Sequence, residues 1–139
     1  AKAINFLYQT QNEEGGWPSH VGPNYLYEGS DIAAMDHIVT ALLRFGEPKN
    51  SLVLKRAVDT LLKHREDWKE PVDGAAVLCV FLTLDYPSNH EYVKELVANL
   101  IKTQRPDGGW NWFGDLPSNP AQTVDCIEQL IKCGVKVLS

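Results

Sequence analysis

The sequence lacks long apolar runs, an excess of basic residues and closely spaced cysteines, and each absence excludes a class of protein. No stretch of 18 or more apolar residues occurs in the 139-residue chain, so the sequence predicts no membrane-spanning helix. No secretory apolar segment opens the chain. The formal net charge is −5, which argues against a general nucleic-acid-binding protein, because such a protein needs a basic face.

The three cysteines, Cys79, Cys126 and Cys133, all lie inside apolar helical patterns. Their odd number and the absence of a CxxC sequence give little support to a disulfide framework or a cysteine metal site. Free cysteines of this kind are usually small buried hydrophobic residues in a reducing compartment. We therefore expect a cytoplasmic protein.

The length of the chain predicts a single domain, residues 1–139, with a substantial core. The chain begins with Ala1 rather than with Met, inside a helical pattern. This start is typical of a trimmed chain or of a piece of a longer protein.

What the sequence does contain is an internal repeat. The segment Ala3–Trp17 (AINFLYQTQNEEGGW) aligns without a gap with Leu96–Trp110 (LVANLIKTQRPDGGW), at an offset of 93 residues. Both copies contain Thr-Gln and end in Gly-Gly-Trp. The segments that follow, Ser30–Gly46 and Ser118–Gly134, also align, and each has capping residues at its start and a cation and a glycine at its end.

Together with a degenerate copy between them, these segments predict six helices in three hairpins, at about 3–46, 53–85 and 90–134. The helices are expected at about 3–11 and 32–45, 53–65 and 74–85, and 90–104 and 120–133. The middle copy keeps Trp68 without the glycines. Its second helix is almost wholly apolar, which predicts that it is buried. The sequence thus predicts an all-α fold.

Each complete copy ends its first helix with Gln and continues through a short turn to Gly-Gly-Trp. The glycines permit a positive φ, the Trp can fold back onto the Gln amide, and the amide can bind backbone groups that helix ends leave unpaired. We therefore interpret the motif as a structural connection between hairpins. Its residues are Gln11, Gly16, Trp17, Gln104, Gly109 and Trp110.

The pattern Q-x3-G-x-W, found at Gln11–Trp17 and Gln104–Trp110, resembles the QW motif of squalene-cyclase and protein-prenyltransferase repeats. The resemblance implies an α/α toroid, with the first helix of each hairpin outside and the second inside, around a central cavity. Three hairpins would form a partial toroid, half of a closed barrel.

The motifs that carry catalysis in that family are missing. Type II terpene cyclases use a DxDD-like run and type I synthases use DDxxD-like magnesium motifs, and neither occurs here. Prenyltransferases bind zinc through an Asp, a Cys two residues later and a distant His. The nearest match begins at Asp73, where Ala75 occupies the Cys position. Because zinc needs three or four good ligands, we expect no metal and no cofactor.

Polar residues remain at the starts of the expected second helices. The candidate catalytic residues are Asp31, Asp36, His37 and Asp73, as general acids or substrate-orienting groups in a partly dry cavity. Adjacent residues on a helix point about 100° apart, so Asp36 and His37 do not form a dyad unaided. In the alternative interpretation, Asp31 and Asp73 cap helices and His37 faces solvent.

Aromatic residues gather in the loops that follow the first helices. Trp17, Tyr25, Tyr27, Trp112 and Phe113 are candidates to line an apolar or sugar-binding cleft, or they cover hairpin ends. The sequence Gly15–Pro18 (GGWP) loosely resembles pectate lyases of the α/α-toroid type. No Arg or Lys stands at a second-helix start to support that resemblance.

These observations favour a prenyltransferase and squalene-cyclase-like repeat domain that binds an isoprenoid or similar apolar ligand, with catalysis unproven. An enzyme of this kind would be terpenoid cyclase-like or prenyltransferase-like. A homodimer, or further repeats of a longer chain, would complete the toroid. The alternatives are a non-catalytic helical-repeat interaction module and a carbohydrate-active toroid related to polysaccharide lyases.

Overall fold

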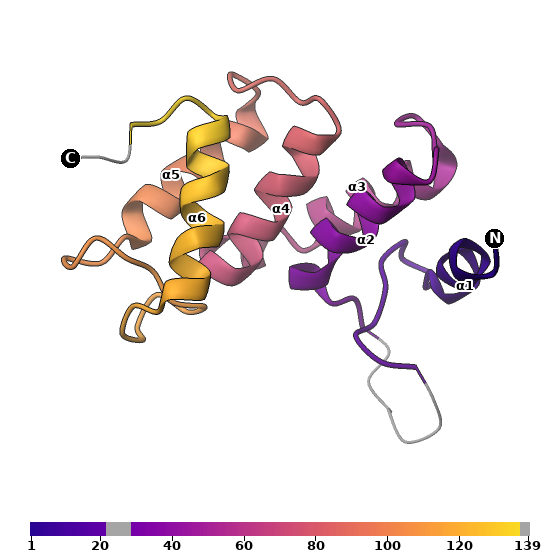
Figure 1. The fold of residues 1–139 in the computed structure, drawn as a ribbon, viewed down its shortest axis with the longest axis horizontal. Helices are drawn as coiled ribbons and strands as arrows, with labels where there is room; N and C mark the ends of the chain where they lie inside the picture. The colour runs from indigo at the N-terminus through magenta and orange to yellow at the C-terminus, as the bar shows by residue number, and fades with distance from the viewer. Residues whose placement is uncertain (22–28, 137–139) are drawn as a thin grey trace. The chain divides into compact units, whose positions relative to one another are not determined.

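The computed structural model describes residues 1–21 and 29–136, which form six α-helices and two short 3₁₀ segments. The helices, shown in Figure 1, are α1 (Lys2–Thr10), α2 (Met35–Arg44), α3 (Leu52–Lys63), α4 (Pro71–Thr83), α5 (Glu91–Thr103) and α6 (Pro120–Lys132), and the 3₁₀ segments are η1 (Ile32–Ala34) and η2 (Arg65–Lys69). In these ranges the β-structure is limited to one bridge between Trp110 and Asn119. The prediction of an all-α fold is confirmed.

The chain divides into two compact units, Ala1–Arg65 and Glu66–Ser139. Unit 1 contains α1 to α3, and unit 2 contains α4 to α6. The middle predicted hairpin therefore has its first helix in one unit and its second helix in the other. A single domain of three hairpins stays a prediction.

The helix ends follow the capping signals in the sequence. Ser51 precedes α3, and its Oγ accepts a hydrogen bond from Leu54 N at 3.2 Å. Asn119 precedes α6, and its Oδ1 accepts one from Gln122 N at 2.8 Å. Gly46, which follows α2, has a φ of 98°, the left-handed conformation in which glycine commonly terminates a helix.

Helix α4 begins about three residues before its predicted start. Pro71 occupies its first turn, where the missing N–H of proline carries no penalty and its fixed φ suits a helix. Glu70 precedes the helix, and Asp73 lies within the first turn. The alternative interpretation of Asp73 as a helix cap is therefore wrong.

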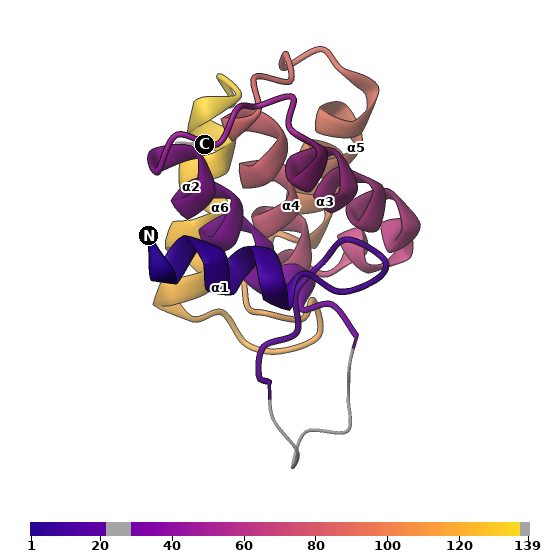
Figure 2. The same cartoon turned by 90° about the vertical axis from the view of Figure 1, so that its right-hand side faces the viewer.

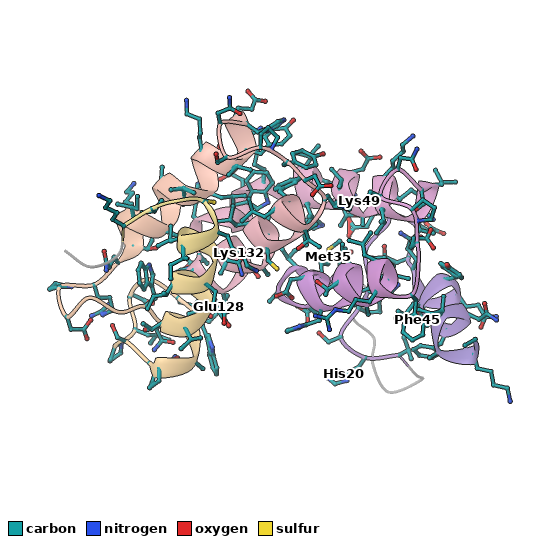
Figure 3. All side chains as sticks on the ribbon, turned by 45° about the horizontal axis from the view of Figure 1, so that its top comes forward. His20, Met35, Phe45, Lys49, Glu128 and Lys132 are labelled. Carbon is teal, nitrogen blue, oxygen red and sulfur yellow. The ribbon has the colours of Figure 1, made fainter. Side chains whose placement is uncertain are left out.

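In unit 1, two helices each bury one face. Met35 (Figure 3), Val39 and Leu42 of α2 are 0% exposed, as are Leu54 and Leu61 of α3. Their spacing of three, four or seven residues places them on one stripe of each helix.

In unit 2, α4 packs against both α5 and α6 (Figure 1). Most residues of α4 are buried, among them Val77, Leu78 and Phe81, as its apolar sequence predicts. The Trp68 ring meets the Phe81 ring edge-on, with centroids 5.6 Å apart. Fully burying a Val, Leu or Phe side chain stabilises the fold by about 1.5–3 kcal/mol. Because α4 contributes several such side chains, it is the centre of the core of this unit.

Candidate functional site

The two complete motifs form loops of the same structure, here called the first motif loop (Gln11–Trp17) and the second motif loop (Gln104–Trp110). In each loop the Gln Nε2 donates to the carbonyl oxygen four residues later, at 2.9 Å in both. The Trp Nε1 donates to a leucine carbonyl of the preceding helix, at 2.8 Å in both. Gly15 and Gly108, at equivalent positions, have φ values of 108° and 89°. The repeat therefore predicts the local structure correctly.

The motif tryptophans lie inside the fold. Trp17 is 2% exposed and Trp110 is 1% exposed, so in this structure neither ring is offered to a ligand. The burial of both rings favours the structural interpretation of the motif over a ligand-stacking role for Trp17.

Each motif loop is also joined to the serine that precedes the next helical segment. A Cβ on Gly16 would lie 2.0 Å from Ser30 Oγ, and one on Gly109 would lie 2.8 Å from Ser118 Cβ. The serine hydroxyls donate to the acidic residue of each loop, both at 2.7 Å: Ser30 to Glu14, and Ser118 to Asp107. Glycine is needed at both positions because the chain passes so close.

The first motif loop docks on α3, as Figure 2 shows within unit 1. Gln11 Nε2 donates to Val53 O at 3.0 Å, and Arg56 Nη1 donates to Gln11 Oε1 at 3.2 Å. Arg56 Nη2 also donates to the carbonyl oxygens of the next two loop residues, at 2.9 and 3.0 Å. Thr60 Oγ1 donates to Glu14 O at 2.7 Å. One arginine and one hydroxyl of α3 therefore bind the backbone of the loop.

Glu14 is the most strongly perturbed carboxyl group of this cluster. Its pKa is lowered from 4.5 to about 2. The hydrogen bond from Ser30 is the largest cause, burial acts in the opposite direction, and His64 and Lys63 also contribute to the lowering. His64 Nε2 lies 3.0 Å and Lys63 Nζ 3.4 Å from Glu14 Oε1. In the second loop, the hydrogen bonds from Ser118 and Gly109 N lower the pKa of Asp107.

Three predicted catalytic candidates, Asp31, Asp36 and His37, lie in unit 1, and the fourth, Asp73, lies in unit 2. Asp31 accepts a hydrogen bond from Ser19 Oγ just before η1. Asp36 Oδ1 accepts a hydrogen bond from His37 N at 2.8 Å and lies 3.8 Å from His37 Nε2. The His37 side chain is 87% exposed, which favours the alternative that it faces solvent. A catalytic role for these residues stays a prediction.

The predicted aromatic candidates have different surroundings. Tyr25 and Tyr27 lie outside the described residues. Trp112 and Phe113 are 53% and 47% exposed, and Leu116, which the sequence analysis missed, is 40% exposed. Leu116 N donates to Phe113 O at 3.2 Å, so a turn brings Leu116 back to the aromatic residues. We call Trp112, Phe113 and Leu116 the aromatic patch.

Two residues of the aromatic patch, Phe113 and Leu116, line a hollow of about 660 Å³, and Trp112 is the chain neighbour of Phe113. The other lining residues are Lys69, Glu70, Thr103, Gly114 and Asp115. The loop is held in place at several points. Val72 N donates to Trp112 O at 3.0 Å, and Gly114 N donates to Glu70 Oε2 at 3.1 Å. Small-molecule sites are usually preformed in this way.

The charges around the hollow are mixed. Among the residues that the structure describes, Lys69 is the one cation that lines the hollow, and its Nζ lies 2.6 Å from Glu66 Oε2. Glu70 and Asp115 add two carboxylates. This balance does not favour an anionic ligand.

In the described part of the chain, no three His, Cys, Asp or Glu side chains lie where they could hold a metal ion together. None of the helices described is both long and apolar enough to cross a membrane. Comparisons with protein-family models, curated proteins and solved structures gave no match. The resemblance to the QW repeat family therefore rests on the motif alone.

Proposed function

We propose that the chain is a helical-repeat domain of the prenyltransferase and squalene-cyclase type that binds an uncharged apolar molecule, such as an isoprenoid alcohol. The proposed site is the aromatic patch of unit 2. The observation that carries this proposal is the exposure of Trp112, Phe113 and Leu116 on one anchored loop beside a hollow.

The physical reason is the hydrophobic effect. Removing apolar surface from water contributes about 25 cal/mol per Å², and neighbouring exposed apolar side chains commonly mark ligand or partner sites. An isoprenoid chain offers apolar surface to both aromatic rings at once. A diphosphate group would meet two carboxylates and a lysine already paired with Glu66, so the uncharged alcohol should bind more tightly than its diphosphate.

Tryptophan fluorescence tests this proposal directly. Of the four tryptophans, Trp17, Trp68 and Trp110 are 1–2% exposed and Trp112 is 53% exposed. Saturable binding of farnesol should therefore shift the emission to shorter wavelength through Trp112, and farnesyl diphosphate should bind more weakly.

Two substitutions distinguish binding at the aromatic patch from non-specific binding to exposed apolar residues. Phe113→Ser should weaken farnesol binding. Phe45→Ser should not, although Phe45 (Figure 3) is 66% exposed at the end of α2. The absence of a saturable shift, or equal effects of the two substitutions, would exclude the aromatic patch as the site.

A further inference from the structure

The two motif loops differ in what lies against them. A Cβ on Gly15 would lie only 2.3 Å from Arg56 O, because α3 packs on the first motif loop. A Cβ on Gly108 would meet no atom within 4 Å in the part of the chain that the structure describes. The same backbone is covered in one copy and open in the other.

The side chain of Gln104 shows the same difference. Gln11 forms hydrogen bonds with Gly15 O, Val53 O and the Arg56 guanidinium. Gln104 is exposed and, among the described residues, forms the single equivalent bond to Gly108 O. Its Oε1 and the second proton of its Nε2 are therefore available to a partner.

The degenerate copy also has a backbone carbonyl bound by the following first helix. In unit 2, Asn99 Nδ2 of α5 donates to the carbonyl of the motif tryptophan, Trp68 O, at 3.4 Å. Thr60 of α3 donates to Glu14 O, which lies three residues before the motif tryptophan of the first copy. When the N-cap residues Ser51 of α3 and His90 of α5 are aligned, Thr60 and Asn99 are at equivalent positions. Two copies thus place their loop on a first helix that offers a hydroxyl or amide donor at this position.

We infer that the second motif loop is a docking surface for an amphipathic helix of a partner protein. That helix carries a cation, a hydroxyl or amide side chain four residues later, and a second cation three or four residues after that. In α3 these positions are Arg56, Thr60, and Lys63 with His64. They face, in turn, the Gln104 amide oxygen with the adjacent carbonyl groups, the Asp107 carbonyl, and the Asp107 carboxylate.

The other first helices of this chain fit the surface less well than α3. In the same register, α1 has Lys2 and then Phe6, which cannot donate a hydrogen bond. Helix α5 has Glu95 in place of the first cation, and its carboxylate would repel the Gln104 amide oxygen and the adjacent carbonyl groups. Of these first helices, a second copy of the chain would offer α1, because its own α3 and α5 already bind the loops of their own copy. The pattern therefore points to a different partner helix.

The test attaches the α3 sequence to the 139-residue chain. A second copy of residues 50–65 is joined after Ser139 by about 20 Gly and Ser residues, with an r.m.s. reach of about 25 Å. The segment is tethered because an isolated helix of this length is only marginally stable in water. A short flexible linker also raises the effective concentration of the attached helix at the loop to the millimolar range. The matched control carries Ala in place of Arg56 and Thr60 in the attached copy only.

With the unaltered tail, the amide proton of Gly108 should exchange at least about tenfold more slowly, and the side-chain amide resonances of Gln104 should shift. Both effects should be lost with the Ala tail and reduced by Gln104→Ala in the chain. Equal protection by both tails, or none by either, would overturn the inference. A concentration-dependent shift of Gly108 in the chain without a tail would make a second copy the occupant and would also overturn it. Farnesol binding at Trp112 is measured separately, so the two proposals fail independently.

Discussion

Two tryptophans on one loop of unit 2 have opposite surroundings. Trp110 is 1% exposed and donates to Leu100 O at 2.8 Å, whereas Trp112 is 53% exposed. Trp110→Ala should lower the free energy of unfolding by about 3–5 kcal/mol, because it leaves a cavity and removes the indole hydrogen bond to Leu100 O. Trp112→Ala should change it by less than about 0.5 kcal/mol. Urea unfolding of the two variants checks this, and equal losses would contradict the structural role of the motif.

The cluster around Glu14 predicts a pH dependence for the stability of unit 1. The folded pKa of Glu14, about 2, lies below its ordinary value of 4.5. The stabilisation is therefore fully present above pH 4.5 and is lost as the pH falls through the folded pKa. We expect Glu14→Gln to flatten the decline of the free energy of unfolding between about pH 5 and pH 2.

The control for that experiment is Glu13→Gln, because Glu13 is the exposed neighbour in the same loop. It should keep the pH dependence of the wild type. Equal slopes for the wild type and Glu14→Gln over this range would show that the carboxylate does not stabilise the fold.

At the residue scale, the sequence predicted the contacts between groups that lie within about seven positions of one another. The Gln, Gly and Trp of each motif lie on one short loop, so their spacing indicates their contacts. The bond from Ser30 to Glu14 joins residues that are 16 positions apart and depends on how the chain folds back. The alignment does place an acidic residue in both loops, at Glu14 and Asp107, but it does not identify the partner.

At the scale of the element, the packing of α3 on the first motif loop makes a prediction about two equivalent glycines. Gly15 and Gly108 both have a positive φ, so alanine is strained at either position. At Gly15 alone the new Cβ would also approach Arg56 O to 2.3 Å. Gly15→Ala should therefore lower the free energy of unfolding by at least about 1 kcal/mol more than Gly108→Ala, as measured by denaturant titration. Matching losses would argue that α3 does not pack closely on this loop.

The helices themselves were predicted to within a few residues because their signals are local. Ser51 and Asn119 cap α3 and α6, and Gly46 follows α2. The sequence predicts a start of α4 that is too late, because Asp73 has the residue type of a helix cap. The conformational preference of Pro71 outweighed that signal.

At the scale of the whole molecule, the sequence predicted the copies and their local folds. A toroid depends on small rotations between successive hairpins, which accumulate along an array and are set by many weak contacts. No single motif encodes them. The division of the chain after Arg65 likewise has no signal in the repeat pattern, which runs through the middle copy without a break.

The thiol of Cys126 should report the opening of unit 2 as a whole. Cys126 is 0% exposed, and burial is the main cause that raises its pKa to about 12. Because the thiolate is the reactive species, Cys126 should react with iodoacetamide at about pH 8 only when the unit opens. Cys79 and Cys133 are half-buried and should react first.

Mass spectrometry of the alkylated chain follows each thiol separately. Trp110→Ala should accelerate modification of Cys126 in proportion to the stability it removes, since the population of the open form sets the rate when closing is fast. In denaturant the three thiols should react at similar rates, which separates protection by the fold from intrinsic reactivity. If native Cys126 reacted as fast as Cys133, the packing of α6 against α4 would be looser than the structure shows.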